Sequence, residues 1–276
     1  MIIQEKSNMI EAALILGSGE IGSSIQRLLH EAGIQTEFAD PPKGIHPDPK
    51  SLQGYLYDVI HVCFPFQDVQ SFLAGILKYV RDGLKVIIIH STTAIGTCAF
   101  LSSFFACPLV HSPLRGTHPQ IYEGIKHFMN FVGCAKPEQF VQVERIINGY
   151  YHRIGIRHMW LETSSETEMG KIVNTTWYGL QIAFATQIAE ICQAKKIEFT
   201  HAYTAWMESD EIGRQYQKVN GRATSKEIIP RPVMVPGQIG GHCVMPNLKL
   251  LEQAVEMDGL TLISWIRRMH EAGGKY

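Results

Sequence analysis

The stretch Gly17-Ser18-Gly19-Glu20-Ile21-Gly22 constrains the fold more than any other part of this 276-residue chain. The apolar run Ala12-Ala13-Leu14-Ile15-Leu16 precedes it, and the helix-like segment Ser23 to Ala32 follows. In such a strand, turn and helix, the first glycine permits the tight turn, the second lets the backbone approach a pyrophosphate, and the third lets the helix pack on its strand. The N–H groups at the helix start would then bind the anion. These six residues therefore predict a dinucleotide-binding loop.

A second strand, Gln35 to Phe38, leads to Asp40. This acid follows the glycine loop by about 20 residues, the sequence separation typical of dinucleotide-binding folds. Asp40 would accept hydrogen bonds from the adenosine ribose hydroxyls and would repel a 2'-phosphate. This favours NAD, although Lys43 nearby leaves NADP open. The alternative is a glycine-rich turn followed by a solvated acid, and the strand and helix context favours the binding loop.

The first part of the chain alternates strands with helices. We predict strands at 59–63, 85–89 and 109–110, helices at 69–80 and near 97–104, and further strands at 128–132 and 154–160. This alternation predicts an α/β fold with a doubly wound, parallel, Rossmann-type sheet. Loops at the carboxyl ends of its strands would carry the cofactor-binding residues Phe64, Pro65, Ser91 and Thr92, and also His111.

The pattern changes near Thr163. Ser165-Glu166-Thr167-Glu168 matches a capping box, and a long helical segment follows from Met169 to Cys192. Its apolar surface is too wide for one neighbour, so we expect a homodimer through the 165–192 helix. We therefore predict a dinucleotide-binding domain over 1–160 and a mostly helical dimerisation and substrate domain over 161–276, interrupted by an irregular stretch from about 221 to 241.

Composition narrows the class of protein. A formal net charge of -1 with 18% charged residues offers no basic surface for nucleic acid. No signal-peptide pattern or membrane span is visible, so we expect a cytoplasmic protein with a small-molecule substrate and no membrane partner. The six cysteines lack CxxC spacing, which is typical of reduced thiols. His242 and Cys243 have no further ligands at recognised spacing, so we predict no metal site.

Six motifs in a fixed order resemble one family of dehydrogenases. The motifs are GSGEIG, DVIHVCFPF, HSTTAIGT, HSPLRG, EMGKIVNTTWYGLQIAFATQIAE and PGQIGGHCVMPNLKLL. Together they resemble the UDP-glucose/GDP-mannose dehydrogenase family, including UDP-N-acetylmannosamine dehydrogenases, from the first strand to about Leu251. The resemblance implies NAD as cofactor, a central helix at a dimer interface, Cys243 as nucleophile, Lys171 as the residue that stabilises an oxyanion or positions a water, and Thr92 near the nicotinamide.

Several positions depart from the family pattern. Asn247 replaces the carboxylate four residues after the cysteine, Pro246 replaces a lysine and Leu114 replaces one glutamate, while His118 falls at or near the second glutamate. The family asparagine of the central helix aligns with Thr175, unless the neighbouring Asn174 has taken its place by a local shift. An amide cannot take a proton near neutral pH, so full oxidation to a carboxylate is not expected. Histidine titrates near neutral pH, and we select His118, ahead of His111 and His242, as the replacement base. The alternative for each is a hydrogen-bonded structural histidine, and Cys243 and Lys171 have packing or solvated roles as alternatives.

The family normally carries a third domain that holds the nucleotide of its substrate, whereas this sequence stops at Tyr276. We expect a smaller substrate, or one held partly by another subunit. The predicted function is an NAD-dependent oxidoreductase acting on a hydroxyl or carbonyl group. The alternatives are a repurposed dinucleotide fold, either a methyltransferase using S-adenosylmethionine or a non-catalytic ligand binder, and a dehydrogenase of the 3-hydroxyacid or prephenate type.

Overall fold

The chain folds as two compact units, Met1–Lys171 and Ile172–Tyr276. The computed structural model describes residues 9–116, 119–219, 233–239, 243–254 and 262–273. The predicted boundary at residue 160 lies before the start of a long helix that contributes its first turns to the first unit. Whether the functional domains divide at residue 160 stays a prediction.

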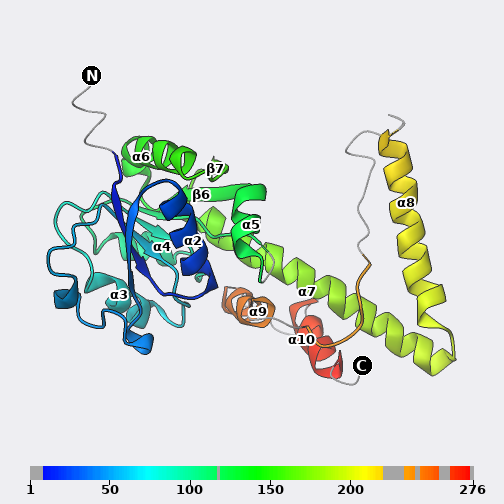
Figure 1. The fold of residues 1–276 in the computed structure, drawn as a ribbon. Helices are drawn as coiled ribbons and strands as arrows, with labels where there is room; N and C mark the ends of the chain where they lie inside the picture. The colour runs from blue at the N-terminus through cyan, green and yellow to red at the C-terminus, as the bar shows by residue number, and fades with distance from the viewer. Residues whose placement is uncertain (1–8, 117–118, 220–232, 240–242, 255–261, 274–276) are drawn as a thin grey trace. The chain divides into compact units, whose positions relative to one another are not determined.

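The first unit is built on a seven-stranded sheet (Figure 1). The strand order is β2-β1-β3-β4-β5-β6-β7, so the order reverses between β1 and β3. In open sheets of this kind the ligand crevice lies beyond the carboxyl ends of the strands at that reversal. The predicted α/β doubly wound fold is confirmed. The strands are β1 (Ala12–Leu16), β2 (Gln35–Ala39), β3 (Val59–Val62), β4 (Val86–Ile89), β5 (Leu109–His111), β6 (Asn130–Cys134) and β7 (His158–Leu161).

Two apolar cores cover the two faces of this sheet. Ala13 and Ile15 of β1 join one core, and Leu14 and Leu16 join the other, because side chains alternate along a strand. The first core takes its helical residues from α2 (Glu20–Glu31), α5 (Ile121–His127) and α6 (Phe140–Arg153), and the second takes them from α3 (Val69–Leu77) and α4 (Thr97–Ser102). Burial of both faces explains why the central strands β1, β3 and β4 read as nearly continuous apolar runs.

One strand pair departs from the predicted parallel sheet. β1 to β5 are parallel, but β6 is antiparallel to β5, with Val110 opposite Cys134. The chain enters β6 from the edge at which β5 ends, since α5 does not return it to the opposite edge. β7 is parallel to β6. The strand predicted over 154–160 is shorter than expected, because α6 ends just before residue 154.

The helix α7 (Ser164–Lys195) begins with a different cap from the predicted one. Glu166 Oε2 accepts a hydrogen bond from the N–H of Thr163 at 3.1 Å, so Glu166 is the acid that caps the start of this helix. The predicted pairing of Ser165 with Glu168 is wrong. Glu168 is fully buried, and its carboxylate binds a loop that is distant in the sequence.

The second unit is helical in its described part. After α7 it contains α8 (Ala205–Val219), α9 (Val244–Gln253) and α10 (Leu262–Gly273), with a π-helical turn at Thr200–Thr204 before α8. A small core joins α7, α9 and α10; it includes Ile182, Val244 and Ile266. Of the predicted irregular stretch from about 221 to 241, the structure describes residues 233–239, which have no regular structure. The other residues of that stretch lie outside the described residues.

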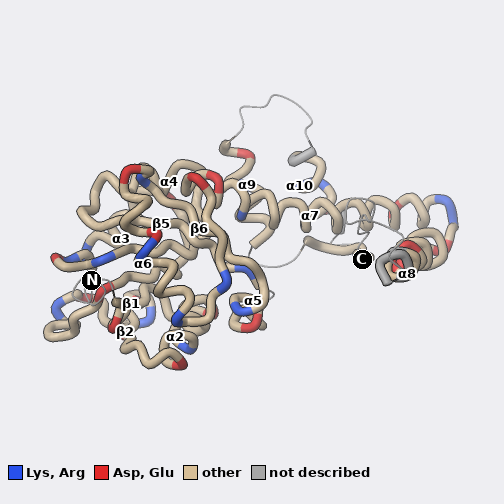
Figure 2. The backbone as a smooth tube through the Cα atoms, turned by 90° about the horizontal axis from the view of Figure 1, so that it is seen from above, with Lys and Arg blue, Asp and Glu red and all other residues tan. Residues whose placement is uncertain are grey.

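Charged side chains of both signs are interspersed along the chain (Figure 2). This agrees with the formal net charge of -1. In the part of the chain that the structure describes, no helix has both the length and the apolar character to cross a membrane. The six cysteines, all within the described ranges, are free thiols.

Candidate functional site

The glycine loop between β1 and α2 has the geometry that its sequence predicts. Gly17 has a φ of +98°, and a Cβ added there would lie 2.9 Å from the backbone N of Phe64. A Cβ on Gly22 would lie 2.0 Å from the carbonyl oxygen of Gly17. A Cβ on Gly19, by contrast, would have no described atom within 4 Å. The fold itself therefore requires Gly17 and Gly22, whereas Gly19 leaves open space beside the loop.

The start of α2 is available to an anion. Gly19 is its N-cap residue, and no described side chain caps this end by a hydrogen bond. Glu20 lies in the first turn, where its Oε1 accepts a hydrogen bond from the N–H of Ile121 at 3.4 Å, and Ile21 packs against the core beneath. The N–H groups at the start of a helix attract anions, so a pyrophosphate fits beside Gly19.

Asp40 lies beyond the end of β2, beside the glycine loop. Its Oδ2 accepts hydrogen bonds from the backbone N–H and the hydroxyl of Ser18 at 2.8 and 2.7 Å. Lys43 Nζ lies 3.5 Å from the same oxygen and donates to Ser18 Oγ at 2.9 Å. Burial acts to raise the pKa of Asp40, but the hydrogen bonds from Ser18 and the charge of Lys43 hold it below its ordinary value. The carboxylate is therefore ionised near neutral pH.

The loops after β3 and β4 are tied to each other. Ser91 is buried, and its Oγ donates to the carbonyl oxygen of Phe64 at 2.6 Å. The ring of Phe64 packs on Phe72, with ring centroids 4.8 Å apart. Pro65 is exposed and Thr92 is half-buried. The structure thus places the predicted residues Phe64, Pro65, Ser91 and Thr92 together at the carboxyl edge, near Gly17.

The first turns of α7 dock on the loops after β4 and β5. Lys171 Nζ donates to the carbonyl oxygen of Leu114 at 2.7 Å, and Thr167 Oγ1 lies 2.7 Å from His111 Nδ1. Glu168 binds the loop after β4, a contact that was not predicted from the sequence. Lys171 is therefore brought to the same edge of the sheet as the glycine loop.

His111 is a structural residue in this arrangement. It is fully buried, and its Nε2 lies 3.1 Å from the carbonyl oxygen of Ser91. Burial lowers its pKa to about 3, so the ring is neutral near pH 7. These contacts favour the structural alternative over a role as catalytic base. His118 and His242 lie outside the described residues, so the prediction that His118 is the base stays a prediction.

A buried chain of hydrogen bonds runs through the core from α6 to the loop after β5. His90 Nδ1 lies 2.7 Å from the carbonyl oxygen of Ser112, which can only accept, so Nδ1 carries the proton. His61 Nδ1 must then donate to His90 Nε2 at 2.8 Å, and Tyr150 must donate to His61 Nε2 at 2.7 Å. Burial lowers the pKa of both histidines, that of His90 to about 4. Both are neutral, and all these contacts lie in the core.

In the second unit, Cys243 is the half-buried N-cap residue of α9. Asn247 is buried, and its backbone N–H donates to the carbonyl oxygen of Cys243 at 3.1 Å. Its Nδ2 donates to Thr175 Oγ1 at 2.7 Å. The structure therefore brings together Asn247 and Thr175, two positions that depart from the resembled family. Lys171 belongs to the first unit, so a common catalytic centre of Lys171 and Cys243 stays a prediction.

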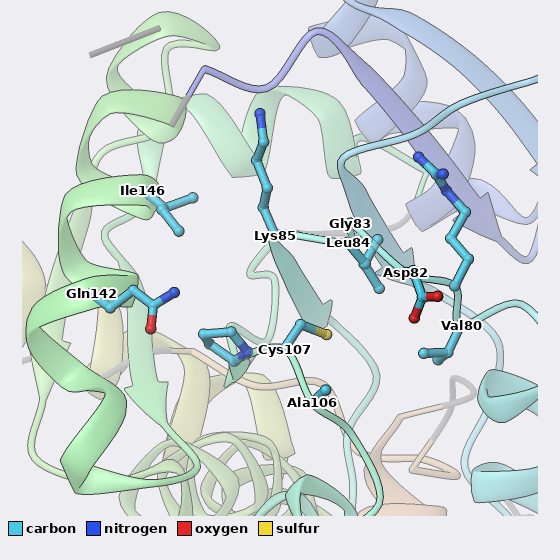
Figure 3. Close-up of a pocket in the computed structure, with 11 residues that line it drawn as sticks. Val80, Asp82, Gly83, Leu84, Lys85, Ala106, Cys107, Gln142 and Ile146 are labelled. Carbon is cyan, nitrogen blue, oxygen red and sulfur yellow. The ribbon is translucent and has the colours of Figure 1, made fainter. Parts of the chain in front are cut away.

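A hollow of about 470 Å³ lies elsewhere in the first unit (Figure 3). Its lining includes Leu84 and Lys85, which precede β4, Pro108, which precedes β5, and Gln142 and Ile146 of α6. These positions lie at the amino ends of the strands. The hollow is therefore at the opposite edge of the sheet from the glycine loop and is separate from the candidate site.

Comparison with known proteins supports the fold. No model of a protein family matches the sequence, and no curated protein matches it. Among solved structures, UDP-D-ManNAc dehydrogenase from Pyrococcus horikoshii matches 94% of this chain and 68% of its own, with 17% identity and a TM-score of 0.69. A UDP-glucose dehydrogenase from Pyrobaculum islandicum matches 96% and 68%, with 12% identity and a TM-score of 0.67. The 3-hydroxyisobutyrate dehydrogenase of Mycobacterium tuberculosis matches 95% and 93%, with 15% identity and a TM-score of 0.62. The chain shares the fold of these proteins.

Proposed function

We propose that this protein is an oxidoreductase that uses a nicotinamide dinucleotide to oxidise a hydroxyl group or reduce a carbonyl group. The observation that carries the proposal is the glycine loop, in which Gly17 and Gly22 are required by close packing while Gly19 leaves space beside the uncapped start of α2. That space suits a pyrophosphate, and Asp40 suits the adenosine ribose. The solved structures of similar fold include several named as dehydrogenases.

Three residues selected from the sequence have defined parts in this proposal. When bound, the nicotinamide would accept or return one hydride. Thr92 would lie against the nicotinamide ring. Lys171 would donate a hydrogen bond to the substrate oxygen and stabilise its developing charge, and His118 would take the hydroxyl proton as the hydride leaves.

We further propose that the reaction is a single two-electron step. In the resembled family a cysteine traps an aldehyde for a second oxidation, which also requires an activated water. Here Asn247 cannot take a proton from water near neutral pH, and its amide is already bound to Thr175. Cys243 then has a substrate-binding or packing role. A single oxidation step accords with the structural match to 3-hydroxyisobutyrate dehydrogenase, of which this chain covers 93%. That match favours a small hydroxyacid as the substrate.

The protein is also proposed to be a homodimer. Val173, Trp177, Phe184 and Ile191 are exposed on α7 and are spaced by four, seven and seven residues. Such spacing places apolar side chains along one stripe of a helix, as in helices that pair with one another. A second copy of α7 offers the same stripe, so the surface is self-complementary under two-fold symmetry.

Isothermal titration tests the cofactor assignment. We expect NADH to bind the wild type, and Gly19→Ala to weaken that binding about tenfold, because the new methyl group fills the space for the pyrophosphate. Gly149→Ala is the matched control, since a Cβ there also meets no described atom within 4 Å but lies on α6. Binding of S-adenosylmethionine without binding of NADH or NADPH would contradict the proposal and favour a methyltransferase.

A further inference from the structure

The start of α7 carries a buried carboxylate for which the proposed reaction provides no role. Glu168 is fully buried, and burial of a carboxylate is much more costly than burial of an apolar side chain unless hydrogen bonds compensate. Burial does raise its pKa, although hydrogen bonds from Cys98, Gly96 and Thr93 oppose that effect. The groups that donate hydrogen bonds to the Glu168 carboxylate therefore indicate the role of this residue.

The partners of Glu168 lie along the turn between β4 and α4. Its Oε2 accepts a hydrogen bond from the N–H of Gly96 at 2.6 Å. Its Oε1 accepts from the N–H of Cys98 at 2.8 Å and from the hydroxyl of Thr93 at 3.3 Å. One carboxylate therefore fixes the turn after β4 at both of its ends. The backbone between Thr93 and Gly96 cannot move away from α7 without breaking these bonds.

The same turn contains Thr92, which the proposed function places against the nicotinamide. Its preceding neighbour, Ser91, is bound to the carbonyl oxygen of Phe64, and its following neighbour, Thr93, is bound to Glu168. Lys171 follows Glu168 by three residues, so both side chains project from one face of α7. That face contacts the loop after β4 through Glu168 and the loop after β5 through Lys171.

We propose that Glu168 is a positioning residue, which holds the turn around Thr92 in the conformation that the nicotinamide half of the cofactor requires. This inference rests on the proposed function. The adenosine half would be bound by the glycine loop and Asp40, and the hydrogen bonds of Glu168 go to neither. Loss of Glu168 therefore weakens binding of the nicotinamide half selectively.

The test compares NADH with ADP-ribose, which lacks the nicotinamide, and therefore needs no knowledge of the substrate. Glu168→Gln keeps the shape of the side chain but turns an NH₂ group toward a backbone N–H, because one carboxylate oxygen is lost. The matched control is Glu166→Gln, which neutralises an exposed acid in the same first turns of α7. Titration calorimetry gives both dissociation constants, and hydrogen exchange at Gly96 and Cys98 reports directly whether the turn is held.

We expect Glu168→Gln to weaken NADH binding by about tenfold and ADP-ribose binding by less than about twofold, as the loss of a hydrogen bond to a charged group implies. Exchange at Gly96 and Cys98 should become faster, and Glu166→Gln should change none of these values. Equal weakening of NADH and ADP-ribose, or unchanged exchange, would overturn the inference. If Glu168→Gln does not fold, Thr93→Val removes the 3.3 Å bond, leaves the bonds of Glu168 to the N–H groups of Gly96 and Cys98, and must shift the NADH to ADP-ribose ratio in the same direction. A wild type that binds neither NADH nor ADP-ribose refutes the proposed function itself, a result distinct from an unchanged ratio.

Discussion

At the scale of single residues, the cofactor assignment depends on an acid and a lysine side by side. The carboxylate of Asp40 receives two hydrogen bonds from Ser18 and the charge of Lys43. Because its folded-state pKa is lower than the ordinary value, Asp40 is ionised at every pH above that ordinary value, and its contribution is lost only as the pH falls through the folded-state pKa. The acid favours ribose hydroxyls, while Lys43 is placed to attract a 2'-phosphate.

Substitution of these two residues should move the cofactor preference in opposite directions. We expect Asp40→Ser to weaken NADH binding by about tenfold with little effect on NADPH, because the acceptor for the ribose hydroxyls is lost and the repulsion of the phosphate is removed. Lys43→Ala should weaken NADPH more than NADH. Titration of both cofactors into each variant measures the preference, and exposed Lys50→Ala is the control. An unchanged NADH to NADPH ratio in Asp40→Ser would show that Asp40 does not contact the ribose.

At the scale of elements, α9 is held close to α7 by a glycine. A Cβ on Gly179 would lie 2.5 Å from Val244 Cγ1, a distance that real Cβ atoms do not adopt. Val244 directly follows Cys243, and Asn247 of the same helix is bound to Thr175 of α7. The close approach of these two helices therefore fixes the position of Cys243 within the second unit.

An alanine at position 179 should separate these helices. We expect Gly179→Ala to reduce the free energy of unfolding of the second unit by about 1–3 kcal/mol, because an overpacked contact forces one helix to shift. Val244→Ala in the same chain should recover part of that loss by making room for the new methyl group. Gly170→Ala is the control, since a Cβ there meets no described atom within 4 Å and alanine favours the helix. Urea unfolding measures the free energy of unfolding of each variant. A double variant no more stable than Gly179→Ala would contradict the predicted contact between position 179 and Val244.

Local patterns predicted the elements better than they predicted contacts between elements. The strands before Gly17, Phe64 and Ser91 are where the apolar runs place them, because both of their faces are buried. The helix α6 was not predicted, although Val143, Ile146, Ile147 and Tyr150 have helical spacing and were a usable signal.

Two errors have a physical cause that no local pattern contains. The sequence near α7 fits a capping box in two registers, and the choice depends on Gly96 and Cys98, about 70 residues earlier, which bind Glu168. The direction of β6 likewise depends on which edge the chain reaches after α5. Sequence spacing also could not establish that Asn247 and Thr175 are hydrogen-bonded partners.

At the scale of the whole molecule, the division into two units matches the division of the proposed chemistry. The first unit contains the glycine loop and Asp40, to which the proposed function assigns cofactor binding, and Lys171, to which it assigns one hydrogen bond to a substrate oxygen. The second contains Cys243 and the exposed apolar stripe of α7. A second copy of the chain would cover that stripe, so the oligomeric state is the property of the whole protein on which the proposal for the second unit depends.

Charge introduced into the stripe should therefore separate the two copies. We expect the wild type to sediment at twice the chain mass of 31.0 kDa, and Trp177→Glu or Ile191→Glu to sediment as single chains, because each places a charge in an apolar contact repeated by symmetry. Val141→Glu is the control, since Val141 is also highly exposed but lies on α6. Sedimentation equilibrium over a range of concentrations gives the masses. A wild type that remains a single chain throughout, or variants that associate as tightly as the wild type, would exclude the stripe as a dimer interface and leave its aromatic side chains for a different partner.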